Sequence, residues 1–307
     1  MSSPSGEHAE APPESPEDRR RTRMGLLFMF LATLCFLVMS AFVKILREDG
    51  MGTSEVMVWR MAPSIPVIWL ELRLRGQKLR PKVPTVLFWR SFFGLVAMAG
   101  YFYALRALTM IENAVLFLLQ PVFVAVFSPV FLDERLRRSA LLALVIALAG
   151  ALLAIRPDQA LRLNLPLLPF LVGMGAAMCS ACAHMLVRKA TAKDSPELVV
   201  FWFTVSASAA AVALALAVGE LRGLPEGLGM IEAALKITAM AGCGLGGQLL
   251  MTRAYGRASA PMVAMISYAN IPLSVLVDLL VWGLTPGLDA IIGSALMIGA
   301  GLLLVRR

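Results

Sequence analysis

Charge is scarce in this sequence. Of its 307 residues only 16% are Asp, Glu, Lys or Arg, whereas 59% are hydrophobic, and the mean hydropathy is +0.77. Soluble domains carry roughly 25% charged residues, and only about half of their residues are apolar. The scarcity therefore excludes an ordinary soluble domain and predicts an integral membrane protein, with the lipid bilayer as its surroundings.

Cysteine and histidine are scarce as well, with 4 and 2 residues. The cysteines lie in apolar segments, where small packing residues are expected rather than a disulfide framework or a redox pair. No HExxH, GxSxG or cluster of histidine with carboxylates occurs. The sequence thus gives no reason to expect a metal, a cofactor or an enzyme. A membrane enzyme acting on lipid would need a catalytic cluster that is missing here.

Long apolar runs make up most of the chain. Residues 1–23, "MSSPSGEHAEAPPESPEDRRRTR", are instead rich in Pro, Glu and Ser and predict a disordered cytoplasmic tail. The following runs of about 20 residues match a hydrocarbon core of roughly 30 Å, so we expect an all-α fold with ten transmembrane helices. The predicted spans are 24–45, 55–73, 84–106, 111–131, 139–155, 166–187, 198–218, 230–252, 260–282 and 287–305.

Basic residues predict the orientation of these spans. With the N-terminus inside, most of the 28 Lys and Arg residues fall in inner segments, among them 19–23, 73–82, 135–138 and 188–193. Cytoplasmic loops carry such an excess, so both termini are expected inside, in a multi-pass protein of the cell inner membrane. The net charge of +8 is then explained by the loops, and nucleic-acid binding is not expected.

An internal repeat relates the two halves of the chain. "LRALTMIENAVLFLLQP", starting at Leu105, aligns with "TRAYGRASAPMVAMISY", starting at Thr252. Because each half holds five predicted helices, the second half enters the membrane from the opposite side. We therefore predict two inverted five-helix repeats, at residues 24–156 and 166–305.

Several stretches carry a family resemblance. They are "SAFVKIL" at 40–46, "EVMVWR" at 55–60, "LFWRSFFGLVAMAGYFYALRALTMIENAVLFLLQPVFVAVFSPVFLDERL" at 87–136 and "TRAYGRASAPMVAMISYANIP" from Thr252. In their order and spacing the chain resembles the drug/metabolite transporter superfamily, of the ten-helix type with two EamA-like halves. The resemblance implies export of a small-molecule substrate, an amino acid or related polar metabolite, by alternating access. Drug or cation efflux, and a lipid scramblase or flippase-like role, are the alternatives.

One departure from that family concerns the end of the fourth helix in each half. The first half has Leu132-Asp133-Glu134, whereas the second has Trp282-Gly283. If the family's acid pairs across a gate, only the first half keeps it.

The predicted substrate site lies at the middle of the membrane. Pro121 removes a backbone donor in the fourth helix and frees a carbonyl that lipid does not satisfy, and Gln120 beside it is polar. The corresponding residues of the second half are Ser267 and Tyr268, with Asn270 and Pro272 just beyond. We interpret these as a paired binding site, with hydrogen bonding between helices as the alternative.

Other residues are weaker candidates for the cavity. Its walls would include Phe36, Tyr101 and Tyr103, although aromatic residues at this depth are more often packing or interface residues, and Gln248 would add a polar contact. The glycine-rich "AGCGLGGQLL", residues 241–250, follows no strand and predicts close helix packing rather than a phosphate loop.

Two arginines lie inside predicted spans. Arg60 is placed either at the mouth of the substrate pathway or in a structural ion pair with Glu55 or Asp278. For Arg90, near the inner face, a lipid-headgroup or structural role is expected.

The sequence gives little indication of proton coupling. Glu112 and Asp278 lie near outer helix ends, and His184, near an inner end, is expected to be a hydrogen-bonded structural residue or a proton sensor. Facilitated diffusion and proton antiport are both left open. Replacing Glu112, Asp278 and His184 singly should remove the pH dependence of a proton-coupled carrier in at least one case.

Overall fold

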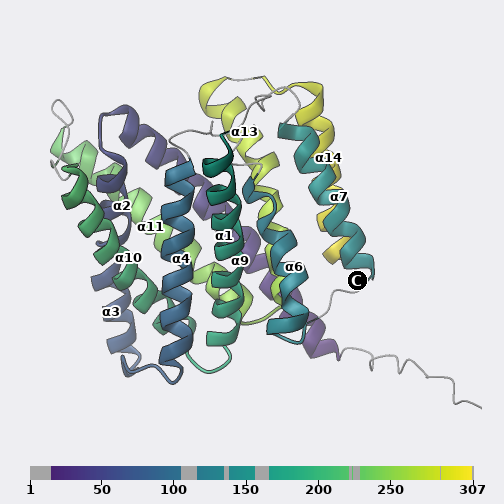
Figure 1. Cartoon of the computed structure of the whole chain (residues 1–307), viewed down its shortest axis with the longest axis horizontal. Helices are drawn as coiled ribbons and strands as arrows, with labels where there is room; N and C mark the ends of the chain where they lie inside the picture. The colour runs from purple at the N-terminus through teal and green to yellow at the C-terminus, as the bar shows by residue number, and fades with distance from the viewer. Residues whose placement is uncertain are drawn as a thin grey trace, which may run out of the picture.

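The fold is a bundle of helices (Figure 1). The computed structural model describes residues 15–104, 116–134, 138–155, 166–220, 223, 229–283 and 285–305, and within these ranges it contains no strand. The helices are α1 (Pro16–Glu48), α2 (Thr53–Met61), α3 (Ser64–Leu74), α4 (Pro84–Ala104), α6 (Gln120–Phe131), α7 (Arg138–Ile155), α9 (Leu167–Ala190), α10 (Pro196–Val218), α11 (Met230–Tyr255), α12 (Ala260–Ile266), η1 (Ser267–Ala269), α13 (Asn270–Trp282) and α14 (Leu288–Val305).

Four of the described helices, α1, α9, α10 and α11, are long and apolar enough to cross a membrane as single helices. Helices α6, α7 and α14, and the run that begins at Ala260, are apolar but shorter. Several apolar helices, packed in one bundle, agree with the predicted integral membrane class.

The first helix begins earlier than expected. It starts at Pro16, inside the segment predicted to be a disordered tail, because local capping outweighs the polar composition. The Ser15 side chain accepts a hydrogen bond from the Asp18 backbone N–H, proline occupies the first turn, and acidic residues follow there. Farther along this extension, the Arg21 side chain donates to the Gly256 carbonyl at 3.1 Å.

Proline divides three of the predicted spans. The second span is two helices, α2 and α3, because Pro63 stands at their junction and lacks a backbone donor. In the fourth span, α6 begins at Gln120, directly before Pro121. In the ninth, the 3₁₀ segment η1 separates α12 from α13, and Pro272 follows. The breaks expected from Pro121 and at 267–272 are therefore present.

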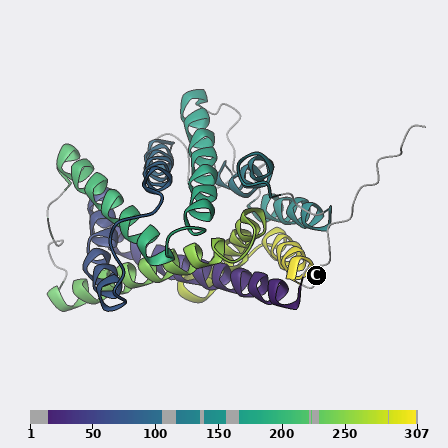
Figure 2. The same ribbon diagram turned by 90° about the horizontal axis from the view of Figure 1, so that it is seen from below.

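Helices far apart in the sequence pack in reciprocal pairs. The most extensive contacts join α1 to α11, α4 to α9 and α7 to α14, and α2 packs on α10 and α6 on α12. Figures 1 and 2 show α7 beside α14 and α1 running along α11. Each of these pairs joins an element before residue 156 to one after residue 166.

Small residues allow the closest approaches. A Cβ on Gly100 would lie 2.9 Å from the Ala176 Cβ at the α4–α9 contact. A Cβ on Gly150 would lie 2.7 Å from the Gly293 carbonyl oxygen at the α7–α14 contact. Gly247 of α11 allows a close approach of α1, because a Cβ there would lie 2.8 Å from the Phe36 ring. The packing predicted for the glycines of residues 241–250 holds at Gly247, whereas Gly242 faces open space.

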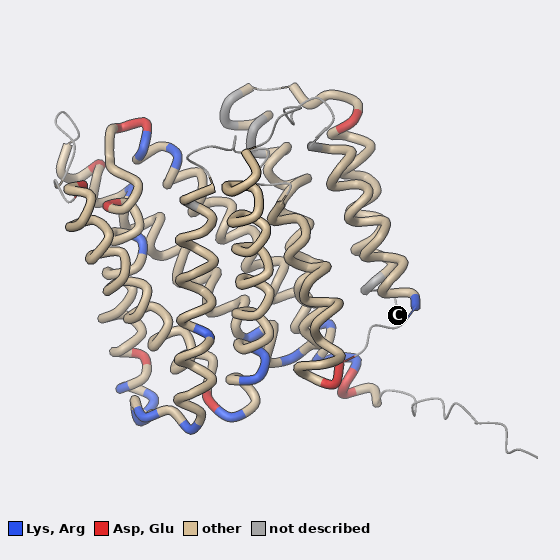
Figure 3. The backbone as a smooth tube through the Cα atoms, in the orientation of Figure 1, with Lys and Arg blue, Asp and Glu red and all other residues tan. Residues whose placement is uncertain are grey.

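Basic side chains gather at one end of the bundle. Figure 3 shows Lys and Arg concentrated at the end that holds the α3–α4 and α9–α10 connections. Acidic partners at the same end include Glu197, which accepts from Arg253 at 2.6 Å, and Asp194, which accepts from the backbone N–H groups of Lys82 and Val83. We call this the basic end.

Candidate functional site

Gln120 lies at the centre of a buried polar contact. It begins α6, is buried, and its Nε2 donates to His184 Nδ1 of α9 at 2.6 Å. The His184 ring stacks on Tyr255 of α11, with centroids 5.3 Å apart and planes 13° apart. Three helices therefore meet through one amide, one imidazole and one phenol ring. His184 is hydrogen-bonded as predicted, and its partner is the predicted site residue.

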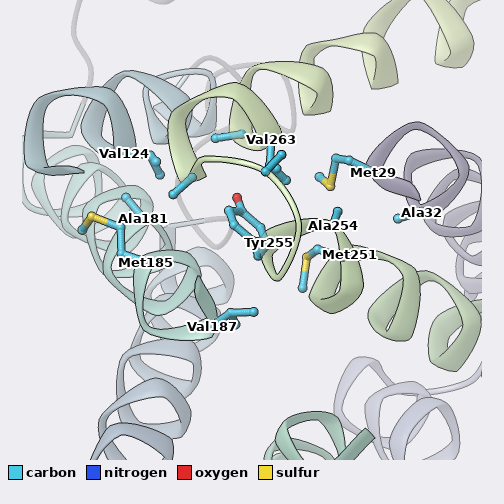
Figure 4. Packing of buried hydrophobic residues seen from close by; sticks show 13 residues of the cluster. Met29, Ala32, Val124, Ala181, Met185, Val187, Met251, Ala254, Tyr255 and Val263 are labelled. Atoms are coloured by element: carbon cyan, nitrogen blue, oxygen red, sulfur yellow. The ribbon is translucent and has the colours of Figure 1, made fainter. Parts of the chain in front are cut away.

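Tyr255 is fully buried in the surrounding apolar cluster. Figure 4 shows its ring among Val124, Ala181 and Val263, which come from α6, α9 and α12. Its hydroxyl lies near the Gln120 amide but makes no hydrogen bond among the described residues. A buried hydroxyl without a partner is uncommon, because burial removes the water that would otherwise bond to it. Tyr255 thus adds an unused polar group beside Gln120.

Arg90 enters the same region from α4. Only 4% of the residue is exposed, and its Nε and Nη1 atoms lack hydrogen-bond partners among the described residues. Its Cζ lies 3.4 Å from the ring centroid of Phe203, on α10. Gly94, one turn farther along α4, makes room for the Arg90 side chain, because a Cβ there would lie 2.9 Å from Arg90 Nη1. His184, on the neighbouring helix α9, lies near Arg90.

The two central helix breaks are joined by Tyr268. Its hydroxyl donates to the Leu118 carbonyl at 2.6 Å, so η1 contacts the chain just before α6. Ser267 donates to the Ala264 carbonyl within its own turn, at 2.5 Å. Asn270 is exposed, unlike Gln120 and Tyr268. The structure therefore brings Gln120 and Tyr268 to the two joined breaks and leaves Asn270 outside them.

The predicted aromatic wall is divided. Phe36 is half-buried and packs on Gly247. Tyr101 is half-buried and meets Phe117 edge to face, with centroids 4.9 Å apart. Tyr103 is 42% exposed, so it points away from the core of the bundle. Phe36 and Tyr101 are thus placed inward, and Tyr103 is not.

Arg60 does not pair with Glu55. The Glu55 carboxylate instead accepts from the Gly223 backbone N–H at 2.8 Å, and Arg60 Nε has no partner among the described residues. Residues five apart lie on different faces of a helix, which explains why the expected ion pair is absent. The Asp278 side chain and Glu112 lie outside the described residues.

Arg60 instead lies against α11. Its Nε is 3.8 Å from the position that a Cβ on Gly244 would take. Gln248, one turn farther along α11, has a buried Nε2 without a partner among the described residues. Arg60, from α2, therefore meets α11 one turn away from the predicted candidate Gln248.

The basic end contains a contact that the sequence only suggested. Glu134 follows α6 and accepts from Arg188 Nε at 2.8 Å and from the Ala260 backbone N–H at 2.7 Å. Arg188 also donates to the Tyr255 carbonyl at 3.0 Å. One acid thus links the ends of α6, α9, α11 and α12. Its signal was the Leu132-Asp133-Glu134 ending, but its partners lie 54 and 126 residues farther along.

Sequence reasoning gave Arg90, His184 and Tyr255 no place in the predicted site. Arg90 and His184 were noted but assigned structural or lipid-facing roles, and Tyr255 was not singled out. Helix periodicity alone does not reveal that α4, α6, α9 and α11 direct these side chains toward one another. The charge of Arg90 inside an apolar run was the one available signal.

This architecture defines a class of protein. A bundle of apolar helices that buries an amide, an imidazole and guanidinium groups beside two broken helices is typical of a multi-pass membrane transporter.

Comparison with known proteins shows similarity to transporters. Residues 23–156 match the model of the EamA-like transporter family. The pseudopaline exporter CntI of Pseudomonas aeruginosa is 28% identical over 290 residues, covering 92% of this chain and 96% of that protein. A riboflavin transporter of Vibrio cholerae is 27% identical over 280 residues, covering 89% and 90%. A protein of known crystal structure superposes with a TM-score of 0.75 at 19% identity, covering 91% of this chain and 95% of the other.

The first half of the chain is thus similar to the EamA-like transporter family, and the relatives that match nearly the whole chain are transporters.

Proposed function

We propose that this protein exports a small organic metabolite, an amino acid or a related polar compound, across the cell inner membrane by alternating access. The observation that carries the proposal is the contact between the two broken helices, Tyr268 hydroxyl to Leu118 carbonyl, with Gln120 beside it. Transporters bind their cargo at such breaks, because exposed backbone groups and polar side chains replace water there. The names of its relatives, an exporter and riboflavin transporters, support the same class.

We further propose two inverted repeats of five helices, 24–156 and 166–305. The reciprocal pairs α1–α11 and α4–α9, and the pairing of α7 with α14, support this, because a pseudo-two-fold axis would produce such contacts. The concentration of Lys and Arg at the basic end supports an orientation with both termini in the cytoplasm. A fluorescent protein that folds only in the cytoplasm should then fluoresce when fused to either terminus.

Alternating access requires a contact that closes one side and opens again. The Glu134 contact has the right place for the inner side, since it ties the end of α6 to α9 and α12. In this arrangement the basic end is held closed and release would occur at the opposite end. The affinity for cargo must differ little between the two states, or the carrier would stall in one of them.

The experiment is a comparison of released metabolites. Cells expressing the chain are compared with cells expressing Gln120→Ala, and compounds enriched in the medium of the first are tested for flux in proteoliposomes. We expect at least one polar metabolite to be released and carried only by the unaltered protein. Equal media, with both proteins folded and inserted, would refute export. A fluorescent-lipid quenching assay on the same proteoliposomes tests the scramblase alternative, for which lipid movement without metabolite flux is the signature.

A further inference from the structure

The buried nitrogens that lack partners are all donors. Within the described residues they are Trp59 Nε1, Arg60 Nε, Arg90 Nε, Arg90 Nη1 and Gln248 Nε2. Indole, guanidinium and amide nitrogens donate hydrogen bonds and do not accept them. More than nine in ten buried polar groups in proteins have a partner, so each of these requires an explanation. Four buried hydroxyls in the described ranges, those of Ser128, Ser208, Tyr255 and Ser294, lack partners too, and a hydroxyl can donate as well as accept. What the five nitrogens lack is a set of acceptors.

Arg90 has the strongest requirement for an acceptor. The Phe203 ring covers the face of its guanidinium, and Gly94 allows Nη1 to approach the backbone of α4 closely. Stacking on an aromatic ring uses the face of the guanidinium and leaves the in-plane N–H groups available for a carboxylate. The group is thus oriented by Phe203, and Nε and Nη1 in its donor edge stay unused.

Two half-buried arginines at the basic end are paired. Arg253 donates to Glu197 and Arg188 to Glu134. Arg90 forms no ion pair among the described residues, and its neighbour His184, whose Nδ1 accepts from Gln120, offers no negative charge. An unpaired charge is costly inside a membrane bundle. Its retention points to a compensating charge that arrives with a ligand.

The other unused donors continue along α11. Gly244, where Arg60 packs, Gln248 and Tyr255 are separated by four and seven residues and so lie on one face of the helix. At 1.5 Å per residue they span about 16 Å. A ligand that follows this face meets one donor after another and needs acceptors at more than one position.

We propose that Arg90, together with Gln120 and Tyr255, binds a carboxylate of the exported metabolite, and that Arg60 and Gln248 bind a second acceptor group of the same molecule. The inference rests on the proposed export function and narrows its substrate class to organic anions. Arg90 is buried within the bundle, which favours a soluble metabolite over a lipid headgroup.

The test uses the purified full chain in detergent without anionic lipid. Thermal unfolding is followed with a panel of amino acids and dicarboxylates, each paired with its primary amide. A saturating carboxylate should raise the unfolding temperature by roughly 3–8 °C, and its amide should not. Arg90→Met should remove the shift and Arg90→Lys should retain part of it. Arg73→Met is the matched control, because Arg73 also lies over an aromatic ring, Trp69, but is exposed; the shift should persist there.

A second readout needs no ligand. If Arg90 is kept for binding, Arg90→Met should unfold at the same temperature as the unaltered protein or higher, because it removes an unpaired charge. A fall of several degrees would assign Arg90 to the structure and overturn the inference. So would equal shifts by carboxylates and amides, a shift that persists in Arg90→Met, or no shift by any carboxylate at millimolar concentration.

Failure of this inference is distinguishable from failure of the export proposal. Flux of only neutral or cationic compounds in proteoliposomes would leave export standing and refute the anion site. Carboxylate binding that depends on Arg90, without flux of the bound compound, would support the anion site and refute export.

Discussion

The basic end and the centre of the bundle differ in whether their charged side chains have partners. At the basic end Glu134 accepts two hydrogen bonds, Glu197 pairs with Arg253, and Asp194 accepts from two backbone N–H groups. In the centre Arg60 and Arg90 have guanidinium nitrogens without partners among the described residues. Desolvation is most costly where water is farthest away, so stability alone would produce the reverse distribution. The centre is therefore arranged for something other than stability.

The largest expected effect comes from exchanging one arginine of each region for methionine. Arg253→Met should lower the free energy of unfolding by about 1–3 kcal/mol, because the buried Glu197 loses its closest partner. Arg60→Met should change it by less than about 1 kcal/mol in either direction, because no ion pair of Arg60 occurs among the residues that the structure describes. Both are measured by denaturant unfolding in the same detergent. Equal losses for the two variants would remove the distinction between the regions.

Glu134→Gln is expected to be next in size. It keeps one acceptor but loses the charge that holds Arg188, so the free energy of unfolding should fall by about 1–2 kcal/mol and the basic end should open more often. Labelling of a cysteine introduced at Ser259, next to the Ala260 contact, should become faster. Glu71→Gln is the control: it pairs with the half-exposed Arg75, so its effect should stay near 0.5 kcal/mol or less. Unchanged labelling would contradict a closing role for Glu134.

Tyr268→Phe tests whether the joined breaks belong to the structure or to the binding site. Loss of the bond to the Leu118 carbonyl should cost about 0.5–1.5 kcal/mol of unfolding free energy. If Tyr268 also contacts cargo, binding should weaken beyond what that loss explains. Tyr103→Phe, at an exposed position, should change neither quantity. Weakened binding with unchanged stability would assign Tyr268 to the binding site. It would contradict a structural role for its hydrogen bond.

The smallest effect on stability is expected for Gln248→Leu. Its amide nitrogen has no described partner to lose, so the free energy of unfolding should stay within about 0.5 kcal/mol of the unaltered value. Binding of a carboxylate that stabilises the unaltered protein should nevertheless weaken. A clear destabilisation would show that Gln248 belongs to the packed structure.

Helices and helix breaks could be predicted from the sequence better than the tertiary contacts of single side chains. Apolar run length located the helices, and Pro121 and Pro272 located two of the breaks, because these are local consequences of backbone chemistry. The start of α1 at Pro16 was missed, since four residues of capping chemistry outweighed the composition of the tail. Gln120 was predicted at the centre, but its partner His184 lies 64 residues away.

The expected pair of Arg60 with Glu55 failed for a geometric reason. Five residues of helix place two side chains on different faces, so proximity in sequence was misleading. The surroundings of Arg90 could not be predicted for the opposite reason, because they are built by Phe203 on a helix distant in sequence. Contacts of this kind depend on how helices pair across the bundle, which no local pattern encodes.

The reciprocal pairing of helices also has a consequence for biosynthesis. Helix α1 ends at Glu48, but α11, its main partner, begins only at Met230. At about 5–20 residues per second, the ribosome needs roughly ten to forty seconds to make the intervening chain. During that interval the face of α1 around Phe36 has α2 beside it but lacks α11, its main partner. Assembly of the bundle must therefore finish after most of the chain has been inserted, and the first half depends on the second for its final packing.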